Sequence, residues 1–207
     1  TELQKNDASF ENSFTKWHKS ESEKATPWKA LRPTAMKLNL PKLEVMDDNS
    51  IYSSGDVTKR DVFDLNFTSD QTITALRLEV LTDDRLPGQG PGRCYYEGRK
   101  GTFFLSEVDL KKSNGSKVKF AKPTATSGNG ADKVIDDVGS SGWSSGIGQD
   151  HHLILPLADP LPANTPFSIE LLFERHFVAS LGRFRISATS STNQRRLVFQ
   201  PDPHDVG

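Results

Sequence analysis

The chain is poor in the residues that mark several protein classes. Its 207 residues include one cysteine, Cys94, which excludes an internal disulfide and a cysteine-based metal cluster. It contains no C-x-x-C-H motif for covalent haem and no G-x-S-x-G motif for a serine nucleophile. No apolar run approaches the roughly 20 residues of a membrane-spanning helix, and no signal peptide opens the chain. We therefore expect either a cytoplasmic protein or a mature or excised piece of a longer one.

An excess of charge of either sign is also lacking. The 26 basic and 27 acidic residues give a net charge of -1, without the concentrated positive charge that binds nucleic acid or an anionic membrane. We accordingly expect neither partner. Turn-forming residues are plentiful instead, with 15 glycines and 12 prolines, and they favour many short strands over a helical bundle.

Short β-forming segments recur along the chain, separated by clusters of Gly, Pro, Asn or Asp. Because no long helical pattern lies between them, neighbouring strands should pair antiparallel. The pattern predicts an all-β fold, an antiparallel β-sandwich or jelly roll. The expected strands cover residues 37–45, 60–68, 73–81, 102–110, 117–120, 133–136, 152–157, 167–173 and 183–189.

The two ends of the chain differ from this strand-rich middle. Phe10, Phe14 and Trp17 fall at helical spacing, which predicts a short amphipathic helix laid on the sheet edge. The C-terminal end carries Pro201 and Pro203 and shows little periodicity. We expect residues 1–36 to form the N-terminal helix and an extended connection packed on the domain, 37–191 the sandwich, and 192–207 a tail or linker.

The segment from Leu86 to Leu110 changes abruptly from a glycine-rich loop to a strand. Its Pro and Gly residues cannot continue a helix or a ladder strand. Planar side chains follow that are suited to packing on a polar ligand and hydrogen bonding to it. They are Arg93, Tyr95, Tyr96 and Arg99. An ordered surface loop whose glycines only fit tight turns is an equal alternative.

Glu107 stands out in the strand after this loop. Alternation places it on the same face as Phe103 and Leu105, where a carboxylate is costly unless it is paired, exposed or bound to a metal. A later segment, residues 121–145, is a long loop of small, oxygen-bearing residues that cannot bury enough apolar surface to hold itself. Its Asp136, Asp137 and nearby backbone carbonyls could hold it around Ca²⁺, and an Asx-type turn is the alternative.

The sequences LSEVDL (105–110) and KVKFAKPTATSGNGADKVIDDVGSSGW (117–143) resemble the signature of discoidin-like, coagulation-factor type C domains. These are galactose-binding-like β-sandwiches, a group that includes many carbohydrate-binding modules. In that family a Glu-bearing strand and such a loop enclose a structural calcium ion. The resemblance implies side-chain ligands from Glu107 and Asp136, and carbonyl or hydroxyl ligands from Ser106, Lys133, Val138 and Ser145.

The chain departs from this signature in two ways. Asp137 stands where the family usually has glycine, and the Glu-bearing strand precedes the loop, where the family has it near the C-terminus. A wider resemblance covers most of the chain. The order of TALRLEVLTDDRLPGQGPGR, GTFFLSEVDL, VIDDVGSSGW, HHLILPL, FSIELLFERHF and LGRFRISAT is similar to a module of large planctomycete proteins that also carry haem-c domains. That resemblance implies an excised, non-catalytic module of a secreted or envelope protein.

Two functions follow from the sequence. The first is a calcium-stabilised, extracytoplasmic carbohydrate-binding module in which Tyr95, Tyr96 and Trp143 stack on sugar rings while Arg93 and Arg99 bond hydroxyls. The second is a scaffold or docking domain that spaces neighbouring domains of the same chain and binds no glycan. An enzyme is the least expected class, because adjacent His151 and His152 would point to opposite faces of a strand.

Overall fold

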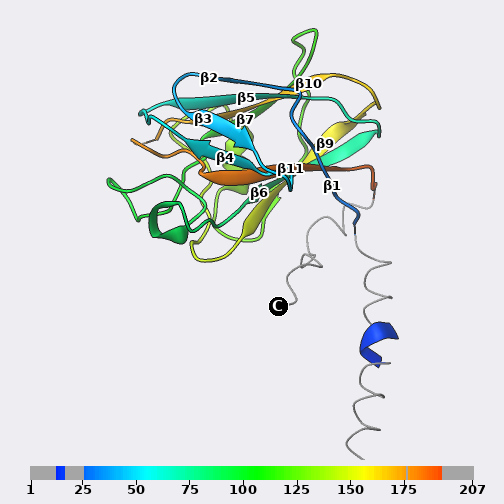
Figure 1. Ribbon diagram of the computed structural model, residues 1–207. Coiled ribbons are helices and arrows are strands. Elements are labelled where there is room, and N and C mark those ends of the chain that lie inside the picture. Colours follow the sequence, from blue (N-terminus) through cyan, green and yellow to red (C-terminus); the bar gives the residue numbers. More distant parts are fainter. Residues whose placement is uncertain (1–12, 17–25, 176, 193–207) are drawn as a thin grey trace, which may run out of the picture.

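Two antiparallel sheets packed face to face make up the protein, as the computed structural model in Figure 1 shows. The structure describes residues 13–16, 26–175 and 177–192. One sheet has the strand order β3-β4-β11-β6-β9-β8, with β1 paired to β11, and the other has the order β2-β5-β10-β7. The predicted all-β sandwich is therefore confirmed. Among the described residues, no helix is long and apolar enough to cross a membrane.

The strands range in length from 2 residues in β1 to 11 residues in β9. Their bounds are β1 Lys29–Ala30, β2 Ala35–Leu38, β3 Lys42–Val45, β4 Ile51–Ser54, β5 Asp61–Phe67, β6 Ile73–Val80, β7 Glu107–Lys112, β8 Thr124–Ala125, β9 His151–Leu161, β10 Phe167–Phe173 and β11 Arg183–Thr189. Two 3-10 turns, η1 Pro87–Gln89 and η2 Ala131–Ile135, interrupt the loops.

Alternation along the strands builds the core. In β5 and β10 every second side chain is buried, which directs one apolar row of each strand toward the facing sheet. Phe63 of β5 lies 5.0 Å from Phe173 of β10 and 5.9 Å from Phe184 of β11, measured between ring centroids. These rings join the two sheets at the centre of the molecule.

Several segments differ from the predicted strands. Residues 37–45 do not form one strand, because they divide into β2 and β3 of opposite sheets around Pro41. Residues 133–136 are not a strand and lie mostly in η2, while 117–120 make only isolated bridges. Residues 13–16 are helical, and the rest of the predicted N-terminal helix lies outside the described residues.

The predicted face of Glu107 is wrong. Alternation breaks at Ser106, which is buried directly after the buried Leu105, and β7 starts only at Glu107. Leu105 pairs with Trp143, whereas the Ser106 N–H donates to the carbonyl of Leu172 in β10, so the chain changes partner between these two residues. Glu107 consequently points outward, away from the core.

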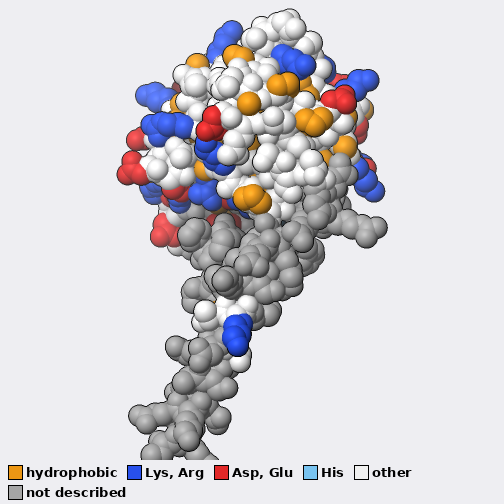
Figure 2. Space-filling model, turned by 90° about the vertical axis from the view of Figure 1, so that its right-hand side faces the viewer, with side chains coloured by type: hydrophobic (Ala, Val, Ile, Leu, Met, Phe, Trp, Pro, Cys, Tyr) orange, Lys and Arg blue, Asp and Glu red, His pale blue; other side chains and the backbone are white. Residues whose placement is uncertain are grey.

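Loops gather at one end of the sandwich and hold one another by backbone hydrogen bonds. The N–H of Arg93 donates to the carbonyl of Ser180 at 3.0 Å, and the N–H of Gly182 donates to the carbonyl of Pro91 at 2.7 Å. The glycine-rich loop is thereby fixed to the turn before β11. On the face shown in Figure 2, charged side chains are interspersed and hydrophobic ones appear in small groups.

Candidate functional site

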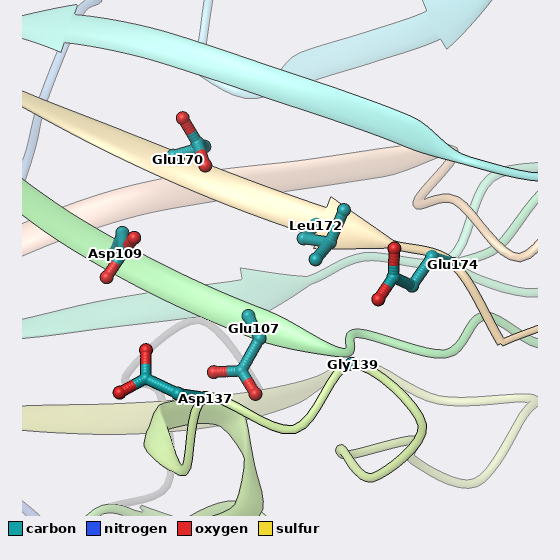
Figure 3. Close-up of a pocket in the computed structure, with 7 residues that line it drawn as sticks. All are labelled: Glu107, Asp109, Asp137, Gly139, Glu170, Leu172 and Glu174. Atoms are coloured by element: carbon teal, nitrogen blue, oxygen red, sulfur yellow. The ribbon is translucent and has the colours of Figure 1, made fainter.

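A groove with acidic walls lies on the outer face of the four-stranded sheet (Figure 3). Its volume is about 210 Å³. The strand register sets Asp109 of β7 opposite Glu170 of β10, so their carboxylates project from adjacent strands on the same face. The lining residues are Glu107, Asp109, Asp137, Gly139, Glu170, Leu172 and Glu174, and we call this site the acidic groove.

Most charges of the acidic groove are compensated. Four of its five carboxylates face a lysine or arginine, and the exception among the described residues is Glu107. Exposed pairs of this kind neutralise local charge but contribute little to folding. The pairs are Lys117 with Asp109 and Asp137 at 2.9 and 3.3 Å, Lys111 with Glu170 at 3.4 Å, and Arg60 with Glu174 at 2.9 Å.

Glu107 is held beside a second carboxylate, that of Asp136. The N–H of Val138 donates to Glu107 Oε1 at 2.7 Å and to Asp136 Oδ1 at 3.0 Å. The Ser141 hydroxyl lies within hydrogen-bond distance of both oxygens of Asp136, at 2.9 and 2.8 Å. Asp137 follows with a φ of 59°, a left-handed conformation that strains a residue with a side chain. The two carboxylates predicted as side-chain calcium ligands thus lie together.

Their surroundings separate the two pKa values. Burial, reinforced by the neighbouring Asp136 carboxylate, raises the pKa of Glu107 to about 7. The Ser141 hydroxyl, in contrast, holds the pKa of Asp136 below its usual range. Near pH 7 Glu107 is therefore only partly ionised beside Asp136, and a cation between the two carboxylates would favour the ionised form of Glu107.

The pair supplies only part of a calcium site. Within the described ranges, no three or more His, Cys, Asp or Glu residues converge in a way that could hold a metal ion. A Ca²⁺ ion, which takes about six to eight oxygen ligands, would therefore draw most of them from backbone carbonyls and water. The facing carboxylates of Glu107 and Asp136 fit an ion bound in that way.

The other four predicted calcium ligands lie in varied surroundings. Ser106 is fully buried, and its hydroxyl accepts a hydrogen bond from the N–H of Glu174 at 3.2 Å. The Ser145 hydroxyl donates to the carbonyl of the next residue at 2.9 Å. Val138 and Lys133 have exposed side chains. These four assignments remain predictions.

The glycine-rich loop folds back on the segment that follows it. The N–H of Gly92 donates to the carbonyl of Gly101 at 2.9 Å, and the N–H of Gly101 donates to the carbonyl of Cys94 at 2.8 Å. A Cβ atom on Gly92 would lie 1.9 Å from the carbonyl oxygen of Thr102, so this backbone approach requires glycine. Residues 95–100 form the tip of the resulting loop.

A second pocket, of about 320 Å³, opens beside this loop. Its walls are formed by the end of β4 with the residues that follow it, and by residues before and after the glycine-rich loop. Two residues predicted to contact a ligand, Arg93 and Tyr95, line it together. The lining residues are Tyr52, Ser53, Ser54, Gly55, Asp56, Val57, Arg85, Leu86, Pro87, Arg93 and Tyr95, and we call this site the loop pocket.

Arg93 is built into the wall of the loop pocket, with 8% of its surface exposed. Its Nη1 donates to the carbonyl of Asp56 at 3.1 Å and to the Ser53 hydroxyl at 3.4 Å, and its Nη2 donates to the carbonyl of Gly55. All three acceptors are neutral. Arg93 therefore fixes the chain after β4 but keeps its positive charge.

Tyr95 and Tyr96 project from the loop tip, 49% and 42% exposed. Their ring centroids are 4.8 Å apart, and the ring centroid of Tyr96 lies 5.8 Å from that of Phe177. Two large rings left in solvent beside a pocket are a feature of binding surfaces. Arg99 also lies in the exposed tip, outside the lining of the pocket.

Trp143 is not placed to contact a ligand, contrary to prediction. It is fully buried, its ring packs edge-on against Phe103 at 5.2 Å, and its Nε1 donates to the carbonyl of Ser127 at 2.8 Å. These contacts, with the Leu105 bridge, anchor the long loop to the core. A tryptophan in an otherwise polar loop serves here as the apolar anchor that such a loop needs.

Sequence reasoning missed several residues of both sites. Glu170 was not identified, although it alternates with buried apolar residues in FSIELLF and is therefore an outward carboxylate. The sequence does not reveal that this strand pairs with the one bearing Asp109. Arg85, which stacks over the Tyr52 ring at 3.9 Å, likewise becomes a pocket residue only through the packing of β4 against the loop.

No protein-family model and no curated protein matches the chain. Among solved structures it is similar to the catalytic domain of a GH87 alpha-1,3-glucanase in complex with nigerose, at 12% identity and a TM-score of 0.37. That match covers 87% of this chain and 30% of the glucanase chain. A family 3a carbohydrate-binding module from the cipA scaffolding of Clostridium thermocellum matches at 13% identity and a TM-score of 0.25, covering 81% of this chain and 87% of the module. Likenesses this remote carry no functional argument.

Proposed function

We propose that the chain is a non-catalytic carbohydrate-binding module that binds a glycan at the loop pocket and the adjoining tyrosines. The observation that carries this proposal is the exposed ring pair of Tyr95 and Tyr96 next to a pocket that contains Arg93. Aromatic faces pack on the apolar faces of sugar rings, and arginine, carbonyl and hydroxyl groups bond sugar hydroxyls. The loop pocket offers all of these within one concavity.

Calcium belongs to the same proposal as a structural ion. Glu107 and Asp136 would hold it, with backbone carbonyls and water completing the shell, and it would tie the loop of residues 121–145 to β7. The raised pKa of Glu107 supports this role, because burial and the neighbouring Asp136 disfavour the ionised form, and a cation between the carboxylates would stabilise that form. An extracytoplasmic location, within a larger multidomain protein, is also proposed and rests on the sequence resemblance.

The binding proposal is tested with a glycan array probed by the purified protein, with and without a chelator. We expect binding to a defined glycan and a weaker signal after chelation. Tyr95→Ala should abolish the signal, while Leu40→Ala, which removes another exposed apolar side chain far along the sequence, should not. Release of reducing ends from the bound glycan should stay at the level of the buffer.

One observation favours a docking scaffold as the second candidate. Arg93 and Gly92 both have structural roles in the loop, which a protein without any ligand would also need. If a protein with a cooperative melting transition binds no glycan on the array, that result would favour the scaffold over the binding module.

The calcium assignment has its own test. Calcium should raise the melting temperature of the wild-type protein, because a ligand that binds only the folded state stabilises it, by about 2.7 kcal/mol at a hundredfold excess over Kd. Glu107→Ala and Asp136→Ala should each lower stability and remove the response to chelator. Unchanged melting curves in both variants would exclude the site.

A further inference from the structure

The two arginines of the loop pocket differ in whether their N–H groups are available to a ligand. Arg93 is buried, and both of its Nη atoms donate to carbonyl or hydroxyl oxygens of residues 53, 55 and 56. The Arg85 side chain is 50% exposed. Its Nε and Nη2 donate to the Asp83 carboxylate at 2.8 and 2.7 Å, while its Nη1 has no hydrogen-bond acceptor among the described residues. Arg85 is therefore the arginine that can donate to a ligand in this pocket.

Two contacts fix the position of the Arg85 guanidinium. The Asp83 carboxylate accepts two of its N–H groups, and its Cζ atom lies 3.9 Å from the centroid of the Tyr52 ring. Asp83 is itself held in place, because its side chain is only 7% exposed and also faces Arg183 at 3.5 Å. A guanidinium held between a carboxylate and an aromatic ring loses little freedom when it donates a further hydrogen bond. The Nη1 group of Arg85 is thus preorganised for a ligand.

The charges around the loop pocket are balanced within the protein. The hydrogen bonds from Arg85 lower the pKa of Asp83 to about 2, so both members of this pair are ionised at neutral pH. Asp61 and Asp56 both attract Arg93. Asp56 also lines the pocket, is exposed, and forms no ion pair within the described ranges. A negatively charged ligand would therefore meet the Asp56 carboxylate and would find no uncompensated cation to offset that repulsion.

The uncharged polar groups of the loop pocket suit the hydroxyls of a ligand. Tyr52, Ser54 and Tyr95 line it, and none of their hydroxyl groups has a hydrogen-bond partner in the described part of the chain. Each hydroxyl can both donate and accept, the Nη1 of Arg85 can only donate, and the carboxylate of Asp56 can only accept. A sugar hydroxyl both donates and accepts, so it needs partners of both kinds. The pocket therefore suits an uncharged ligand that is rich in hydroxyls.

We infer that the loop pocket selects neutral sugars over acidic ones, with Arg85 as the donor and Asp56 as the acceptor for the sugar hydroxyls. Asp56 excludes acidic sugars by like-charge repulsion. Arg93 then supports the wall of the pocket and does not contact the sugar. This assignment rests on the proposed function and deepens it, because it names the class of glycan and the arginine that binds it. The neighbouring ring of Tyr95 covers the apolar face of the same sugar.

The first test compares neutral and acidic polysaccharides on the wild-type protein. The neutral set is galactan, mannan, xyloglucan, dextran and laminarin, and the acidic set is polygalacturonate, alginate and hyaluronate. Affinity gel electrophoresis identifies the polymers that retard the protein, and calorimetry at constant ionic strength then gives their Kd values. We expect at least one neutral polymer to bind, and every acidic polymer to bind about tenfold more weakly or less than the strongest neutral one.

Three variants, all at exposed positions, locate the effect on the strongest neutral polymer. Arg85→Lys keeps a positive charge beside Asp83 but removes the planar donor, and it should weaken binding about tenfold or more. Asp56→Asn keeps an acceptor but removes the charge, and it should narrow the ratio of neutral to acidic affinity about threefold or more. Arg60→Gln is the matched control. Arg60 is 61% exposed and its ion pair with Glu174 lies in the acidic groove, so Kd should stay within about twofold.

Each outcome has one meaning. An acidic polymer that binds as tightly as any neutral one would overturn the choice of a neutral sugar and leave the carbohydrate-binding proposal standing. Unchanged binding by Arg85→Lys would overturn the role of Arg85. If that variant fails to fold, the comparison of polymers on the wild-type protein still decides the class of sugar. Failure of every polymer, acidic or neutral, to bind a folded protein would overturn the proposed function itself.

Discussion

The acidic groove and the loop pocket differ in how their charges are balanced. The groove displays five carboxylates, but four of them have a lysine or arginine partner, and Glu107 shares its surroundings with Asp136. The loop pocket displays far less charge, and its buried Arg93 bonds carbonyl and hydroxyl oxygens and is attracted by Asp61 and Asp56. The comparison teaches that a large number of charges does not by itself indicate a ligand, because most of the charges in the groove are neutralised by exposed ion pairs within the protein.

The two regions also differ in how they are held in place. The groove stands largely on paired strands, where the register of β7 and β10 fixes Glu107, Asp109 and Glu170. The loop pocket depends on glycine-mediated backbone contacts and on single anchoring side chains. Variants that remove one of these supports should therefore affect one region and leave the other unchanged.

Trp143→Ala should have the largest effect on stability. The side chain is fully buried and anchors the loop that carries Asp136, so its removal should lower the free energy of unfolding by about 3–5 kcal/mol. Urea unfolding followed by fluorescence of the remaining tryptophans or by circular dichroism measures this loss. Tyr95→Ala is the control, since an exposed side chain should change stability by about 0.5 kcal/mol or less. A loss of under about 1 kcal/mol for Trp143→Ala would contradict its role as the anchor.

Gly92→Ala should destabilise the loop pocket and leave the groove intact. The new Cβ would meet the carbonyl of Thr102, so the loop must shift, at a cost of about 1–3 kcal/mol. Gly115→Ala is the matched control, because no atom lies within 4 Å of the added Cβ there, and only the positive φ of 81° is unfavourable. Melting temperatures of both variants are compared with that of the wild type, and an unchanged melting temperature for Gly92→Ala would contradict the role of this backbone contact.

Glu107→Gln should remove a pH dependence from the calcium-free protein. The pKa of Glu107 is raised, to about 7, so its contribution is fully present below about pH 4.5 and is lost as the pH rises through 7. Discounted for partial exposure, the loss is about 1–2 kcal/mol. Urea unfolding of the wild type and the variant at intervals between pH 4 and 8 measures this loss as the difference between their free energies of unfolding. Parallel stability curves, or a difference that grows toward low pH, would contradict the assignment.

Lys117→Gln should have the smallest effect. It removes the pairs with Asp109 and Asp137, but the Lys117 side chain is 55% exposed, so the free energy of unfolding should fall by about 0.5 kcal/mol or less. Chemical denaturation in low and high salt measures the change, and salt should erase it. A loss of free energy of unfolding above about 1 kcal/mol would mean that neutralising the carboxylates of the groove contributes more to folding than exposed ion pairs usually do.

The strands were predictable where alternation is regular. Burial alternates over the whole length of β5 and β10 and over the first four residues of β11, and the expected ranges cover all three strands. Prediction failed where a strand changes partner. At Ser106 the chain passes from Trp143 to β10, and a sequence read alone shows no break there because Leu105 and Val108 both suit a strand.

The sites were predictable only in part, because they are made by contacts between distant segments. Glu107 and Asp136 were expected together through a family resemblance, and the structure brings them together. Arg93 and Tyr95 were identified by residue type beside glycines, yet the burial of Arg93 depends on the chain after β4. Trp143 was assigned to a ligand for its ring alone, which does not distinguish an anchor from a binding platform.

The most direct measurement is a calorimetric titration of the strongest glycan from the array into three proteins: the wild type, Tyr95→Ala at the loop pocket, and Glu170→Gln in the acidic groove. We expect Tyr95→Ala to weaken binding about tenfold or more, which corresponds to roughly 1.4 kcal/mol, and Glu170→Gln to leave Kd within about twofold. The reverse pattern, in which Glu170→Gln loses the glycan and Tyr95→Ala retains it, would place the ligand in the acidic groove and contradict the binding site proposed for this protein.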